Sequence, residues 1–182
     1  IHISPWRFDD ALNAALALVP KDADYCVAMD LDEIMLPGWH QKLRKAHKEG
    51  IDRPEYRFIT AWDENGNPVT EFNGFRIHRR ERMRWTYPIH EVLECYEGTE
   101  TRKVYNFESH HLPDHDKPRN YMALLQKAAE TNPDSRNLYY LGREYFGHKM
   151  LPEAQKTFEK YLEISQFPAE KSFTMRMMAK CQ

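Results

Sequence analysis

One stretch of the chain decides the predicted fold: Tyr25-Cys26-Val27-Ala28-Met29-Asp30-Leu31-Asp32-Glu33. Its first five residues form a continuous apolar run, which is typical of a strand buried on both faces of a mostly parallel sheet. Two carboxylates, Asp30 and Asp32, follow directly. At such a position they emerge at the carboxyl edge of the sheet, where open α/β folds bind ligands. The stretch therefore predicts an α/β domain with an acidic ligand site.

The residues around this stretch predict the rest of the domain. Apolar residues recur at helical spacing over 6–19, and Pro37-Gly38 opens a second helix. From 55 to 110 the pattern changes to strands, with a hairpin turn at Asn65-Gly66. This order predicts an α/β fold with a mixed sheet, because the later strands add antiparallel pairs. Strands are expected over 56–62, 74–80, 84–87, 89–96 and 102–109.

The chain beyond residue 118 reads as helical throughout. Helices are predicted over 119–131, 136–147, 152–164 and 170–180. Five positions, Leu141, Gly142, Tyr145, Ala154 and Phe158, fall on the tetratricopeptide pattern, in which small residues let paired helices pack closely. The predicted domains are thus an α/β domain over 1–117 and tetratricopeptide-like helices over 118–182.

Composition excludes several classes of protein. Among 182 residues, 26 Lys and Arg face 28 Asp and Glu, and the net charge of −2 argues against a nucleic-acid binder. No apolar run reaches the roughly 20 residues that a membrane span needs. The three cysteines are odd in number and widely spaced, which indicates a reducing, cytoplasmic location. The chain begins at Ile1 rather than Met, and we expect it to be a piece of a longer protein.

Asp30 and Asp32 form a pair of hard oxygen ligands. Such a pair suits Mg²⁺ or Mn²⁺, and the bound cation can in turn hold a diphosphate. The alternative is a solvated acidic turn that caps the helix that follows.

Three groups of residues, in this order, resemble the second half of a family 2 glycosyltransferase of the GT-A fold. The first joins Trp6-Arg7-Phe8-Asp9-Asp10-Ala11-Leu12-Asn13 to the stretch that ends in Asp30-Leu31-Asp32-Glu33. The second is Ile89-His90-Glu91, and the third is His110-His111 followed by Lys117-Pro118-Arg119-Asn120. Members of a bacterial branch of this family also carry tetratricopeptide-like helices. The family's opening βαβ segment, which grips the nucleoside base, is absent here, and Leu12 stands where an arginine is common.

The resemblance implies a nucleotide-diphospho-sugar donor, with a UDP-sugar as the first expectation, and a divalent cation. Asp30 would face the ribose and the metal, Asp32 would ligate the metal, and a histidine would complete the coordination. The spacing to Lys117 favours His111 over His110 for that role. Adjacent residues of a strand point to opposite faces, so we expect only one of the two at the site. Imidazole suits Mn²⁺ better than Mg²⁺.

Inverting transfer needs a group that takes the proton of the acceptor hydroxyl, which belongs to a sugar, a lipid or a protein. Glu91 is the predicted base and His90 the alternative, although Glu91 could instead orient a backbone segment or an arginine. Trp85 is expected to contact the donor, with core packing as the alternative. Of the five arginines between Arg76 and Arg84, we expect at most one at the site.

Two other functions stay open. A metal-dependent phosphohydrolase would use a two-metal site built from Asp30 and Asp32. Its other ligands would be His110, His111, Asp114, His115 and Asp116. The third possibility is a binding module, in which the helices hold a protein partner and the α/β part is inactive.

Overall fold

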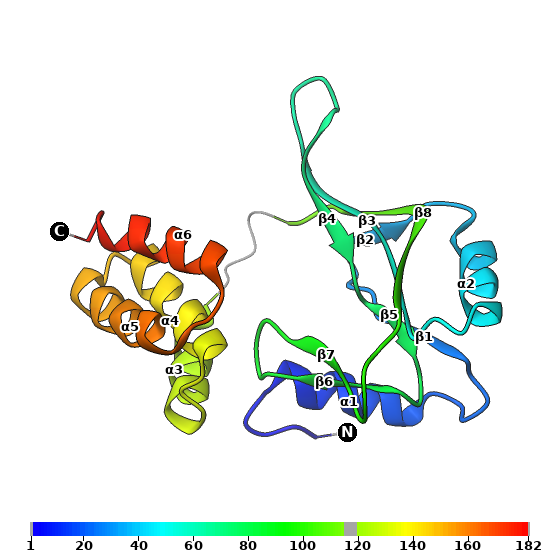
Figure 1. Ribbon diagram of the computed structural model, residues 1–182, viewed down its shortest axis with the longest axis horizontal. Coiled ribbons are helices and arrows are strands. Elements are labelled where there is room, and N and C mark those ends of the chain that lie inside the picture. The colour runs from blue at the N-terminus through cyan, green and yellow to red at the C-terminus, as the bar shows by residue number, and fades with distance from the viewer. Residues whose placement is uncertain (1, 115–119, 182) are drawn as a thin grey trace. The chain divides into compact units, whose positions relative to one another are not determined.

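The computed structural model describes residues 2–114 and 120–181, which form two compact units (Figure 1). The first unit comprises Ile1–Ile3, Asp9–Thr86 and Glu91–Pro118. The second comprises Ser4–Phe8, Tyr87–His90 and Arg119–Gln182. The chain is therefore mixed α/β, with a mixed sheet in the first unit and helices in both.

The first unit contains a mixed four-stranded sheet in the order β2-β8-β3-β4. The parallel pair is β3 and β8, whereas β2 pairs antiparallel with β8 and β4 pairs antiparallel with β3. Two further antiparallel pairs, β1-β5 and β6-β7, complete the strands. The elements are α1 (Phe8–Leu18), β1 (Tyr25–Val27), β2 (Glu33–Met35), α2 (Trp39–Lys48), β3 (Arg53–Trp62), β4 (Pro68–Gly74), β5 (Ile77–Arg79), β6 (Met83–Thr86), β7 (Val92–Cys95) and β8 (Arg102–His111).

The main core of this unit lies between α2 and the sheet. Leu43 and Ala46 of α2 pack against the buried rings of Tyr56, Phe58 and Phe107. The Tyr56 and Phe107 rings stack with their centroids 5.1 Å apart. Because β3 and β8 contribute these rings, the core fixes the register of the two central strands.

The predicted environment of residues 25–29 is wrong. β1 covers only Tyr25–Val27, is half-buried, and pairs antiparallel with β5 instead of lying inside a parallel sheet. The reason is that these residues contact two separate clusters. Tyr25 and Val27 pack on the main core, whereas Ala28 packs on the β6-β7 cluster, which is formed by Met83, Trp85 and Leu93. Met29 is 39% exposed. The apolar residues of this stretch therefore serve contacts with two different clusters, and they do not indicate a strand inside a parallel sheet.

The predicted hairpin at Asn65-Gly66 is confirmed. Gly66 adopts φ +80°, which L side chains rarely adopt, and Asp63 Oδ1 accepts hydrogen bonds from the backbone N–H groups of Asn65 and Asn67. The turn joins β3 to β4, and this hairpin extends beyond the rest of the unit (Figure 1). The strand over 68–73 was not predicted, because β4 is an exposed edge strand whose residues alternate weakly in polarity.

The second unit is built from α3 (Met122–Thr131), α4 (Ser135–Gly147), α5 (Leu151–Ile164) and α6 (Pro168–Met178). Asp134 caps α4 by accepting a hydrogen bond from the Asn137 N–H. A Cβ added at Gly142 would lie 2.4 Å from the ring of Phe158, which is fully buried. α4 and α5 therefore pack closely because this position has no side chain.

None of the helices in the described part of the chain has the length and apolar character needed to cross a membrane.

Candidate functional site

Residues 30–32 form an acidic turn between β1 and β2, and hydrogen bonds between Asp30 and Glu33 stabilise it. The Glu33 N–H donates to the Asp30 carbonyl at 3.1 Å, and the Asp30 N–H donates to Glu33 Oε2 at 3.3 Å. The Leu112 N–H donates to the Asp32 carbonyl at 2.7 Å. The end of β8 therefore lies beside the turn, and Leu31 projects from the turn into solvent.

This arrangement brings Asp32 and His111 together. Glu33 of β2 pairs with His111 of β8, and directly opposed residues project from the same face of a sheet. His111 Nε2 lies 3.3 Å from Asp32 Oδ2. The His111 ring also stacks on Phe58 of the main core, with centroids 6.1 Å apart. The contacts with the Phe58 ring and with the Asp32 carboxylate thus define the orientation of the His111 imidazole.

His110 faces away from the acidic turn. It pairs with Ile34, on the opposite face of the sheet from His111. Its Nε2 lies 3.4 Å from Glu108 Oε2, and its ring contacts Trp62 edge-on at 5.2 Å. Of the two adjacent histidines, the structure therefore places His111 beside the acidic turn.

Arg76 joins the acidic turn to Glu91. Its Nη1 donates to Asp30 Oδ2 at 2.6 Å and lies 3.5 Å from Glu33 Oε1. Its Nη2 donates to Glu91 Oε1 at 3.5 Å. The Arg76 carbonyl accepts a hydrogen bond from the Ala28 N–H, which holds the start of this segment beside the end of β1. One guanidinium therefore contacts three carboxylates from two separate segments of the chain.

The six side chains Asp30, Asp32, Glu33, Arg76, Glu91 and His111 form what we call the carboxylate cluster. The cluster holds four carboxylates and one guanidinium, so it is negatively charged; the guanidinium contacts three of the four. Burial raises the pKa of Glu33, although the positive charge of Arg76 opposes this shift. Burial also acts to lower the pKa of Arg76, but the carboxylates of Asp30 and Glu33 outweigh it and raise that pKa overall. The cluster is arranged to hold positive charge.

The other four arginines of the basic stretch contact different groups. Arg79 and Arg82 lie near Asp52, Arg80 Nε donates to the Val19 carbonyl, and Arg84 pairs with Glu94. Arg76 alone among the five reaches the cluster within the described residues. Nothing in the local pattern distinguishes Arg76 from its neighbours, because its role depends on the pairing of β1 with β5.

Trp85 lies in the core of the β6-β7 cluster, as the alternative interpretation has it. The residue is 3% exposed and packs with Met83 and Leu93. The Asn13 side chain accepts a hydrogen bond from the Trp85 N–H at 2.9 Å and donates one to its carbonyl at 2.8 Å. The ring therefore offers little surface to a donor in this conformation.

His90 belongs to the second unit. Its carbonyl accepts hydrogen bonds from Arg136 Nε at 3.2 Å and Nη2 at 2.7 Å, and its ring stacks on Tyr140 with centroids 3.9 Å apart. The backbone has φ +52°, which is uncommon for a residue with a side chain. Burial of the ring, followed by the positive charges of Arg136 and Arg143, lowers the pKa of His90 to about 4. The imidazole is therefore neutral near pH 7.

The residues expected for a two-metal site are described only in part. Asp114 lies within the described residues, whereas His115 and Asp116 lie outside them, as does the stretch Lys117-Pro118-Arg119. Over residues 2–114 and 120–181, no three His, Cys, Asp or Glu side chains gather into a group that could hold a metal ion on its own.

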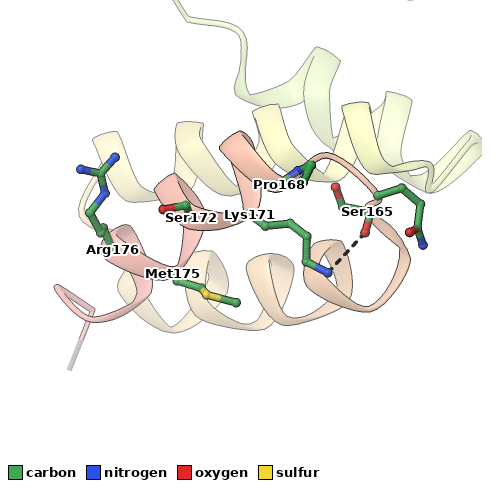
Figure 2. Close-up of a pocket in the computed structure, with 7 residues that line it drawn as sticks. Ser165, Pro168, Lys171, Ser172, Met175 and Arg176 are labelled. Carbon is green, nitrogen blue, oxygen red and sulfur yellow. Dashed lines mark hydrogen bonds between the residues drawn. The ribbon is translucent and has the colours of Figure 1, made fainter.

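The second unit has an open cavity of about 640 Å³ beside the start of α6 (Figure 2). Lys171 Nζ donates across it to the Ser165 carbonyl at 3.4 Å. The lining residues contain no carboxylate, imidazole or thiol. The lining residues are Ser165, Gln166, Pro168, Lys171, Ser172, Met175 and Arg176.

No family model matches the chain, and no curated protein matches it.

Proposed function

We propose that the first unit carries part of the active site of a metal-dependent glycosyltransferase. It would move a sugar from a nucleotide-diphospho-sugar, with a UDP-sugar as the first candidate, to a hydroxyl acceptor with inversion. The observation that carries the proposal is the 3.3 Å contact between Asp32 and His111. These residues are far apart in the sequence, and the proposed site requires them to be neighbours.

The residues present fit a divalent cation that is shared with a substrate. Mg²⁺ sites that bind phosphates commonly use only one or two protein carboxylates, and phosphate oxygens and water supply the other ligands. Asp32 and His111 would hold the ion, with Asp30 as the additional carboxylate, and the imidazole favours Mn²⁺. When bound, such an ion stabilises the negative charge of the departing diphosphate.

The negative charge of the carboxylate cluster also supports a requirement for a cation. Asp30, Asp32, Glu33 and Glu91 together would repel a diphosphate that arrived without a cation. A metal–nucleotide complex reduces that repulsion. We therefore expect UDP to bind only in the presence of the cation.

Glu91 is the proposed general base. Its carboxylate would take the proton of the acceptor hydroxyl while the hydroxyl oxygen bonds to the anomeric carbon and the bond from that carbon to the diphosphate breaks. The side chain is 14% exposed and its Oε1 contacts Arg76 Nη2, which supports a defined orientation. Arg76 also links Glu91 to the turn that carries Asp30.

Calorimetry with UDP in the presence and absence of Mn²⁺ tests the proposal. Wild-type protein should bind UDP only with Mn²⁺, and Asp32→Ala and His111→Ala should each weaken binding by about tenfold or more. His110→Ala is the matched control, because it removes the adjacent imidazole on the opposite face of the sheet. Binding that is unchanged in Asp32→Ala would contradict the proposed site.

Hydrolysis of a UDP-sugar, with water as the acceptor, provides an activity measurement that needs no knowledge of the natural acceptor. Turnover should be lost in Glu91→Gln while Mn²⁺-dependent UDP binding is kept. Turnover of a simple phosphoester without any requirement for a sugar nucleotide would favour the phosphohydrolase instead.

A further inference from the structure

Arg76 differs from the other arginines of the first unit in what it contacts. Its two terminal nitrogens reach Asp30, Glu33 and Glu91, with the shortest distance, 2.6 Å, to Asp30. The Glu33 side chain is 3% exposed, so this guanidinium neutralises a buried carboxylate as well as two more accessible ones. The positive charge therefore lies among the carboxylates rather than on the surface beside them.

Arg57 provides a comparison within the same unit. It also bridges two carboxylates, with Nη2 and Nε on Glu71 and Nη1 3.0 Å from Glu108 Oε1. The Arg57 side chain is more exposed than that of Arg76, and neither of its partners is a residue of the carboxylate cluster. Both arginines therefore bridge carboxylates, but only Arg76 has its charge inside the proposed site.

We infer that Arg76 is a positioning residue that holds Asp30 and Glu91 together and serves as the protein's own cation, in competition with a divalent metal ion for the cluster. The inference rests on the proposed function, which assigns Asp30 and Glu91 their roles. It adds that Arg76 balances the negative charge of the cluster in the free protein, whereas a divalent ion takes over part of that role in the metal-bound protein.

Removal of the Arg76 charge should have two effects of opposite sign. The affinity for a divalent cation should rise, because a fixed positive charge a few ångströms away no longer opposes the ion. The rate of transfer should fall, because Glu91 loses the group that orients it. An arginine with a merely structural role would not produce this combination, since a loosened site binds metal more weakly and reacts more slowly.

The test compares Arg76→Gln, Arg76→Ala and Arg76→Lys with Arg57→Gln as the matched control. Binding of Mn²⁺ alone is followed from the electron paramagnetic resonance signal of the free ion. We expect Arg76→Gln and Arg76→Ala to bind Mn²⁺ about tenfold more tightly than wild type. Arg76→Lys and Arg57→Gln should match the wild-type affinity. Unchanged or weaker Mn²⁺ binding in a folded neutral variant, or no binding in any variant, would overturn the inference.

The second measurement is UDP-sugar hydrolysis by the same proteins. Its kcat should fall about 100-fold in Arg76→Gln with little change in KM, and Arg76→Lys should recover part of the rate. An unchanged kcat in Arg76→Gln would overturn the positioning role. If wild-type protein has no turnover and does not bind UDP, the proposed function fails, and the Mn²⁺ comparison still decides whether Arg76 competes with a cation. Circular dichroism selects folded variants, and Arg76→Gln keeps most of the side-chain volume in case Arg76→Ala does not fold.

Discussion

His111 Nε2 lies 3.3 Å from Asp32 Oδ2, at the point where the end of β8 meets the turn before β2. The contact joins residues that are far apart in the sequence of the first unit, and the antiparallel pairing of β2 with β8 produces it. If both side chains hold the same cation, their effects on binding must depend on each other.

A double-mutant cycle measures this dependence. We expect Asp32→Asn and His111→Ala each to weaken Mn²⁺-dependent UDP binding, and the double variant to be little worse than either single one. Calorimetric titrations of the four proteins give the coupling free energy. In a parallel cycle with His110→Ala, the effects should simply add, because His110 lies on the other face. Additive effects in the His111 cycle would show that the two side chains do not share a ligand.

His90 should make the stability of the protein depend on pH. Its pKa is about 4 in the folded state, below the ordinary value of 6.5, so the unfolded chain binds this proton more readily. Stability from this group is therefore present above pH 6.5 and is lost as the pH falls from 6.5 towards 4. The residue stays partly exposed, which limits the effect to about 1 kcal/mol.

The measurement compares denaturant unfolding of wild type and His90→Asn between pH 4 and 7. Asn is chosen because it tolerates a positive φ. As the pH falls from 6.5 to 4, wild type should lose stability relative to His90→Asn, and above pH 6.5 the difference between the two proteins should be constant. An NMR titration of the ring checks the pKa directly, and Arg136→Ala should raise it by removing a nearby positive charge. A wild-type midpoint near 6.5 would contradict the lowered pKa of this ring.

Gly142→Ala should destabilise the second unit. The added methyl group would lie 2.4 Å from the Phe158 ring, and neither helix can move away without loss of packing. We expect the free energy of unfolding to fall by about 1–3 kcal/mol. Gly147→Ala is the control, because no atom lies within 4 Å of its added Cβ. There the higher helix propensity of alanine should leave stability unchanged or raise it by up to about 1 kcal/mol.

Loss of the Glu100 carboxylate should be costly. Glu100 pairs with Arg53, and both side chains are largely buried. In Glu100→Gln the Arg53 charge stays buried with a weaker partner, so we expect the free energy of unfolding to fall by about 3 kcal/mol. Glu94→Gln breaks the exposed pair with Arg84 and should cost less than about 1 kcal/mol. Equal effects of the two substitutions in urea unfolding would contradict this distinction.

Local chemistry made the turn, the helices and the helix–helix contact predictable. Asn65-Gly66 specifies a tight turn by itself, because glycine accepts a positive φ. The helices of the second unit follow from apolar spacing within each segment. Gly142 was expected to let paired helices pack closely because it has no side chain, and the ring that it approaches is that of Phe158.

Four of the six side chains of the carboxylate cluster were predicted, but their connections were not. Asp30, Asp32, Glu91 and one of two histidines were candidates from their residue types and their order in the chain. Arg76 could not be singled out from five arginines, because the pairing of β1 with β5 determines which of them reaches the acidic turn.

The amino-acid order thus specified the elements whose interactions are local, and it named the polar groups available for chemistry. Folding in three dimensions chose among them: the β2-β8 register turned His111 rather than His110 towards Asp32, and core packing placed Trp85 away from solvent. The physical reason is that strand pairing and burial depend on partners distant in the chain, whose register no single segment encodes.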